Sequence, residues 1–259
     1  MRLSLLATVF INAFAFAIAF AQNPLPQFEV ATVKSPGPQD RIITLYNYPG
    51  GRVAISLYTF ALLLHEALGV QRFQVVGAPA WIDSERFIIE AKPPASSKLS
   101  SFTPSNREAP LVEEQRQMLL ALLIDRFQLK FHRESKEEAV YLLTKGPKEP
   151  MFEAPKHPES RMFFAGLLGG GSGTVSGGNA TMEFIASQLS RSMGGPVIDR
   201  TGLAGPFDFT LEHIYDPAEE HDLVTIAQRT VGALGLKLER SRGPVEMIVI
   251  DHLEKPSAN

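Results

Sequence analysis

The chain has 259 residues, of which 44% are hydrophobic and 20% are charged, and its formal net charge is -3. This composition is typical of a globular protein, and the length allows one large domain or two smaller ones. A weakly acidic chain has no general attraction to nucleic acid, so we expect no nucleic-acid partner. Because the chain contains no Cys, it also lacks disulfides, thiolate nucleophiles and Cys-ligated metal sites.

The N-terminus has the pattern of a secretory signal peptide. Arg2 supplies a positive charge, an apolar run extends to Phe20, and small residues lie at Ala19 and Ala21. We therefore predict a signal peptide over residues 1–21, cleavage after Ala21, and a periplasmic or extracellular location. The alternative is an uncleaved membrane anchor, since the run is close to the shortest length that spans a bilayer. No second long apolar run follows, so we expect no transmembrane segment after cleavage.

The rest of the chain contains one pattern of residues twice. In the first copy the glycines Gly50 and Gly51 precede an apolar stretch and then Thr59, and in the second copy Gly169–Gly173 precede a similar stretch and then Thr181. Both copies predict a strand, a glycine turn, a second strand and a helix that begins at a threonine cap. Further along each copy, helical spacing of apolar residues predicts helices over residues 113–126 and 222–234.

Each of these later helices leads into two predicted strands joined by a polar turn. The strands are predicted over residues 127–133 and 139–144 in the first copy, and over residues 234–240 and 245–250 in the second. Ser241–Pro244 has the composition of a turn. The complete unit is therefore β-β-α-β-β-α-β-β, present twice by duplication. Chance similarity between two ordinary α+β segments is the alternative interpretation.

These elements predict an α+β fold of two homologous halves, each a mixed sheet with two helices packed on one face. The first α+β repeat is assigned to residues 22–150 and the second to residues 173–259. Residues 151–172, rich in Pro and then in Gly, are assigned to a linker or loop.

No motif in the chain matches a known catalytic or metal site. His65 and Glu66 form half of the zinc-protease motif H-E-x-x-H, but Gly69 stands where the second His is needed. The glycine-rich segment around Ser172 lacks the last Gly of G-x-S-x-G. The acidic segment 213–222, which contains two His, has no recognised metal-loop spacing, although weak binding of zinc or calcium stays open. We therefore expect no enzyme activity, no cofactor and no metal.

Trp81, the only Trp, lies close to Asp83. Two interpretations are open. An aromatic ring beside acidic groups can stack on a sugar, as in glycosidases, or the ring can anchor the packing of a core.

Several longer segments resemble one protein family. The chain is similar to a large bacterial family of exported, soil-associated proteins of unknown function over Phe28–Lys34, Gly77–Phe87, Leu122–Glu134, Pro196–Thr210 and Gly243–Ser257. The family carries no established activity, and fusion of some relatives to membrane-bound sensor peptidases implies a sensing or interaction role. Pro206 departs from the Gly-Arg or Gly-Lys pair expected there, which puts a role for a basic residue at that position in doubt. A more distant resemblance, over residues 181–211, is to the short βαβ modules of secretins and TonB-dependent receptors.

We therefore expect a non-enzymatic extracytoplasmic recognition or sensing module for a peptide, glycan or protein partner. The cleft between the halves is the expected pocket, and exposed strand edges offer a second binding mode. The candidate ligand contacts are Trp81, Asp83, Arg86, Asp199, Arg200 and Asp208. The alternatives are an exported hydrolase that uses carboxylate or histidine chemistry, and a structural component of the envelope. An enzyme should gather several ionisable side chains in one concave pocket.

Overall fold

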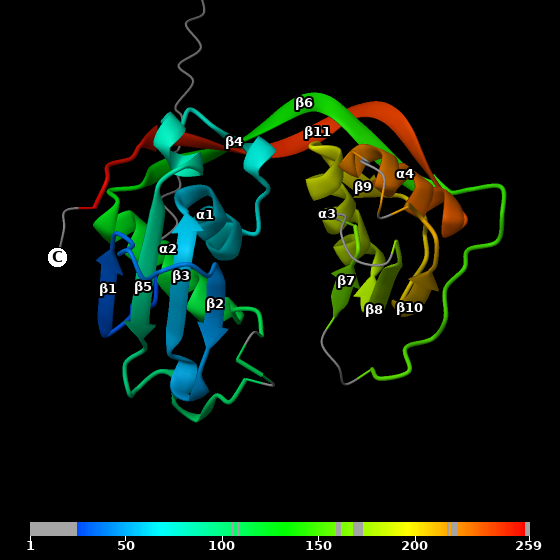
Figure 1. Cartoon of the computed structure of the whole chain (residues 1–259). Coiled ribbons are helices and arrows are strands. Elements are labelled where there is room, and N and C mark those ends of the chain that lie inside the picture. Colours follow the sequence, from blue (N-terminus) through cyan, green and yellow to red (C-terminus); the bar gives the residue numbers. More distant parts are fainter. Residues whose placement is uncertain are drawn as a thin grey trace, which may run out of the picture.

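The computed structural model of the protein describes residues 25–104, 106–107, 109–158, 162–167, 173–216, 218 and 222–256. The predicted signal peptide lies outside the described residues. The fold class is α+β, as the sequence predicts. Two helix-and-sheet bodies lie side by side, and a long two-stranded ribbon arches over both (Figure 1).

The first half is an antiparallel sheet with two helices. Its elements are β1 (Val30–Lys34), β2 (Thr44–Asn47), β3 (Val53–Thr59), α1 (Phe60–Leu68), β5 (Arg86–Lys92) and α2 (Glu113–Arg126). The strands lie in the order β1, β5, β3, β2 (Figure 1). Short 3-10 turns connect them at η1 (Pro49–Gly51), η2 (Arg72–Gln74), η3 (Ala80–Asp83) and η4 (Lys98–Ser101).

The second half has a similar but shorter series of elements, and its described residues include no counterpart of β1. The elements are β7 (Phe163–Ala165), β8 (Val175–Thr181), α3 (Met182–Met193), β10 (Pro206–Leu211) and α4 (Leu223–Ala233). The strands form an antiparallel sheet in the order β10, β8, β7. Strand β7 falls within the segment assigned to the linker, so the second half begins before residue 173.

Matching caps define the equivalent helices α1 and α3. The hydroxyl of Thr59 accepts a hydrogen bond from the N–H of Leu62 at 3.4 Å, and the hydroxyl of Thr181 accepts one from Phe184 at 3.2 Å. Each helix ends at a glycine in the left-handed region, Gly69 with φ 71° and Gly194 with φ 63°. A polar N-cap and a left-handed C-cap satisfy backbone groups that a helix end leaves unpaired.

A third sheet joins the two halves. Its centre is the antiparallel ribbon of β6 (Lys130–Lys145) and β11 (Leu236–His252), which pair along their length from Lys130 opposite His252 to Lys145 opposite Leu236. Strand β4 (Val75–Val76) adds in parallel to β11, and β9 (Val197–Asp199) adds in parallel to β6. The mixed sheet is therefore the one that the halves share, whereas the sheet within each half is antiparallel. This corrects the expectation of one mixed sheet in each half.

The predicted turns between the late strands of each copy are wrong. Residues 134–138 and Ser241–Pro244 continue as extended strand inside β6 and β11. The late strands of one copy pair with those of the other copy and do not form a hairpin within their own copy. Both arrangements make antiparallel backbone hydrogen bonds of the same kind. The start of β6 and the end of β11 therefore belong to the first half, and their other ends belong to the second. A boundary at residue 150 does not separate the halves in space.

Each half has its own hydrophobic core, and the ribbon contributes to both. The first core contains Phe60 and Phe127 together with Ile248 and Ile250 of β11. The second core contains Leu143 of β6 and Leu236 of β11. The two bodies are thus packed separately but share two strands.

Candidate functional site

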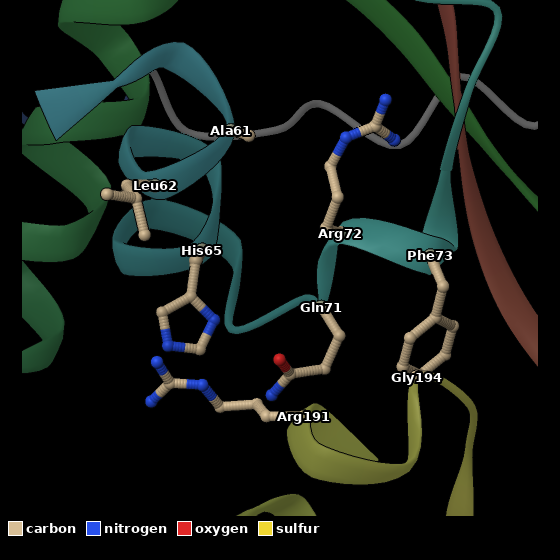
Figure 2. A pocket seen from close by; sticks show the side chains of 8 residues that line it. All are labelled: Ala61, Leu62, His65, Gln71, Arg72, Phe73, Arg191 and Gly194. Carbon is tan, nitrogen blue, oxygen red and sulfur yellow. The ribbon is translucent and has the colours of Figure 1, made fainter. Parts of the chain in front are cut away.

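A cavity of about 400 Å³ lies between helix α1 of the first half and helix α3 of the second. Its walls are Ala61, Leu62 and His65 from α1, Gln71, Arg72 and Phe73 from the loop that follows, and Arg191 and Gly194 from the end of α3 (Figure 2). We call it the first cavity. The expected pocket between the halves therefore exists, and its volume is in the range of small-ligand sites.

The two faces of α1 explain why these residues line the cavity. Phe60, Leu63, Leu64 and Ala67 recur with helical spacing and are buried in the first core. Ala61, Leu62 and His65 lie on another face of the helix and are half-buried at the cavity wall.

A second cavity of about 280 Å³ adjoins the first and shares Gln71 and Phe73 with it. Glu183 and Asp199 also line this second cavity. The side-chain amide of Gln71 donates a hydrogen bond to the hydroxyl of Ser187 at 3.3 Å, which links the first half directly to α3.

The two arginines of the first cavity differ in their partners. Arg72 donates to both carboxylate oxygens of Asp83, from Nε at 2.5 Å and from Nη2 at 2.8 Å, and its side chain points away from Arg191 (Figure 2). The hydrogen bond from Arg72 holds the pKa of Asp83 below its ordinary value. The guanidinium of Arg191 extends along the cavity toward His65 (Figure 2) and makes no hydrogen bond within the described part of the chain. Its positive charge is therefore available to a ligand.

The ring of His65 is fixed by its own loop. Its Nδ1 lies 2.9 Å from the carbonyl oxygen of Val70. A carbonyl only accepts, so Nδ1 carries a proton, and in the neutral form of the ring Nε2 is an acceptor. This nitrogen makes no hydrogen bond to any other described residue, and the ring faces Arg191 (Figure 2).

Glu66, the neighbour of His65, interacts electrostatically with His65, Arg116 and Arg191. Burial raises the pKa of its carboxyl, and the opposing attraction of His65, Arg116 and Arg191 is weaker. Burial, with repulsion by Glu66, also raises the pKa of Tyr58 to about 12. Together, Glu66, Arg116 and Arg191 carry more positive than negative charge, which favours an anion near Arg191.

The predicted contacts of the first half lie away from the cavity wall. Trp81 is half-buried against the core, with its ring 5.6 Å from Phe60 and 6.2 Å from Phe87 between centroids, so it acts as a packing anchor. Asp83 pairs with Arg72. Arg86 donates to the carbonyl of Leu57 at 2.8 Å, where strand β3 is bulged.

The predicted contacts of the second half are also held locally, and Asp199 lines the second cavity. Asp199 accepts hydrogen bonds from the N–H and the hydroxyl of Thr201, each at 2.8 Å. The guanidinium of Arg200 donates to the carbonyl of Asp199 at 3.3 Å, and the backbone N–H of Arg200 donates to a ribbon carbonyl. Asp208 accepts from the backbone N–H groups of Lys156 and Asn179, which hold its pKa below the ordinary value.

The acidic segment 213–222 lies partly outside the described residues. Its last residue, Asp222, caps helix α4 by accepting from the N–H of Thr225 at 2.7 Å. Among the residues described, no group of three or more His, Asp or Glu is placed to hold a metal ion. No helix within the described ranges is long and apolar enough to cross a membrane.

Sequence reasoning missed three residues that define the first cavity, namely His65, Gln71 and Arg191. His65 was considered only as part of a zinc motif. In both α1 and α3, a helical face that is not part of the core lies next to a glycine cap, and this feature could have indicated a cavity wall. That the two faces lie opposite each other depends on how the ribbon places the halves.

Comparison with known proteins assigns the chain to a family but not to an activity. No curated protein and no solved structure matches the chain at a significant level. A family model, described as a protein of unknown function (DUF3738), matches residues 61–253. The match includes both cavities and the whole ribbon, and covers most of the chain. The chain therefore belongs to the DUF3738 family.

Proposed function

We propose that this protein is an exported recognition module that holds a peptide, glycan or protein ligand in the first cavity. The observation that carries the proposal is the composition of the walls, since both halves contribute and apolar side chains alternate with Gln71, His65 and Arg191. A largely apolar pocket with a few polar groups is the usual form of a ligand site. The predicted signal peptide supports a location outside the cytoplasm.

An exported hydrolase is the second candidate function. Glu183 and Asp199 line the second cavity together, and paired carboxylates are the catalytic groups of glycosidases. However, Asp199 is already bonded to Thr201, and Glu183 is exposed in the first turn of α3. These local roles favour binding over hydrolysis.

A fragment screen by ligand-observed NMR tests the binding function. The sample is the mature chain from Gln22, and the blocking variant is Ala61→Trp, which places an indole at the wall of the first cavity. The matched control is Ala139→Trp, because Ala139 is exposed on the ribbon strand β6. We expect fragments that bind the wild type and the control but not the blocking variant.

The contrary outcomes are equally specific. Fragments that bind all three proteins alike, or no bound fragments at all, would refute a ligand site in the first cavity. Release of dye from 4-methylumbelliferyl glycosides by the wild type, abolished in Glu183→Gln, would favour the hydrolase instead.

A further inference from the structure

We propose that the ligand of the first cavity is the C-terminal end of a peptide, with its carboxylate on Arg191 and its last, apolar side chain against Leu62. This inference rests on the proposed function and specifies its ligand class. It follows from three features of the walls, namely an available cation, an available acceptor and an apolar surface.

The available cation is Arg191. A guanidinium binds a carboxylate through two parallel N–H···O hydrogen bonds, and such charge-assisted bonds are stronger than neutral ones. Arg72 cannot serve in this way, because Asp83 occupies its Nε and Nη2. Glu66 attracts both Arg116 and Arg191, so its single carboxylate cannot neutralise both guanidinium groups.

The available acceptor is Nε2 of His65. Because Nδ1 donates to Val70, Nε2 of the neutral ring can accept an N–H from a ligand. A carboxylate that is attached to a carbon bearing an amide N–H offers both complementary groups close together. This combination is found at the C-terminus of every peptide chain, whereas a simple fatty acid has the carboxylate alone.

The apolar surface near Arg191 is formed by Ala61 and Leu62 of α1, and Phe73 lies at the other end of the cavity (Figure 2). Phe73 points toward Gly194 across the cavity (Figure 2), and a Cβ atom built at Gly194 would meet nothing within 4 Å. The cavity is thus open at the Gly194 end, where earlier residues of a peptide can leave it, and an aliphatic last side chain packed on Leu62 would remove apolar surface from water.

Titration calorimetry with three probes tests the inference. The probes are N-acetyl-Ala-Leu as the free acid, the same dipeptide as the C-terminal amide, and hexanoate. We expect the acid to bind the mature chain about tenfold or more tightly than the amide, which is the effect of one charge-assisted pair. Hexanoate should bind more weakly than the dipeptide acid, because it offers no N–H to His65. Equal affinity for hexanoate would refute the peptide terminus and leave a general carboxylate site.

Matched arginine variants test the role of Arg191. Arg191→Gln should lose the preference for acid over amide, whereas Arg240→Gln, which removes the same charge from an exposed position of β11, should keep it. Thermal melts of both variants establish that they are folded. An unchanged preference in folded Arg191→Gln would overturn the inference.

The outcomes separate this inference from the proposed function. If fragments bind in the first cavity, as shown by loss in Ala61→Trp, but acid and amide bind alike, the recognition site stands and the carboxylate assignment falls. If the blocking variant changes the binding of no fragment and of none of the three probes, both proposals fail.

Discussion

Gly243 of β11 lies opposite Glu138 of β6 near the middle of the ribbon, where the chain passes from one half to the other. The backbone at Gly243 is extended and not left-handed, and a Cβ atom there would lie at ordinary contact distances of 3.6 Å from Val140 and 3.9 Å from Ile198. The glycine is therefore not required by the backbone, although it lies in a segment with the composition of a turn.

This position distinguishes the continuous ribbon from a pair of closed hairpins. In the ribbon, Gly243→Ala should raise the free energy of unfolding by about 0.5 kcal/mol, since alanine restricts the unfolded chain and fits the strand. In a closed hairpin with a left-handed glycine at this place, the same change would lower it. Urea denaturation of the two proteins measures the difference, and a clear loss of stability would contradict the open arrangement.

Gly177 is a position where close approach does require glycine. It pairs with Phe209 across β8 and β10, and an added Cβ atom would lie 2.3 Å from the phenyl ring. We expect Gly177→Ala to lower the free energy of unfolding by about 1–3 kcal/mol through overpacking. The control is Gly232→Ala in helix α4, where nothing lies within 4 Å and alanine should stabilise the helix by up to about 1 kcal/mol. Similar stability for the two variants would contradict the packing of Phe209 on Gly177.

A buried amide pair should be one of the most sensitive points of the first half. Gln115 and Asn47 are both fully buried, and Nε2 of Gln115 donates to Asn47 at 2.8 Å and to the carbonyl of Gly51 at 3.0 Å. Gln115→Leu leaves these acceptors unpaired, which should cost about 2 kcal/mol or more in denaturation experiments. Gln117→Leu serves as control, because the side-chain amide of Gln117 donates to Glu113 on the exposed side of the same helix. Equal losses in the two variants would disprove the special role of the buried pair.

Glu66 should make stability depend on pH. Its pKa is raised in the folded state from the ordinary value of 4.5, so the folded protein holds this proton more tightly than the unfolded chain does. The free energy of unfolding should therefore fall as pH rises from about that value through the raised pKa. Glu66→Gln should remove this fall, whereas Glu90→Gln at an exposed position of β5 should retain it. Denaturation curves over a pH series test this, and parallel pH profiles for wild type and Glu66→Gln would contradict it.

Local patterns predicted the helices well and the course of the late strands poorly. The range 113–126 agrees with α2, and 222–234 contains α4. The apolar spacing of each helix and the residues that mark its ends lie close together in the sequence. The segment Ser241–Pro244 has turn composition, but whether a hairpin closes or opens depends on which distant strand is available to pair. Both arrangements use the same residues and similar backbone hydrogen bonds, so the local sequence does not distinguish them.

The candidate site was also predicted only in part. The location between the halves was predicted, but among the predicted contacts only Asp199 directly lines one of the two cavities described above. The other predicted contacts have local structural roles instead: the ring of Trp81 packs on the core, and the charged groups bond to neighbouring residues. These residues are Trp81, Asp83, Arg86, Arg200 and Asp208. Arg191 and His65 are inconspicuous helical residues, and only the juxtaposition of α1 and α3 makes them a pair.

The shared ribbon has a consequence for how the molecule loses its structure. Severing the backbone anywhere between Lys145 and Phe163 would yield two fragments, each missing a strand that the other carries, so neither can complete its interior alone. Heating should accordingly melt both bodies in a single cooperative transition, despite their separate interiors. A nicked molecule should stay assembled at neutral pH and come apart only when that transition is reached.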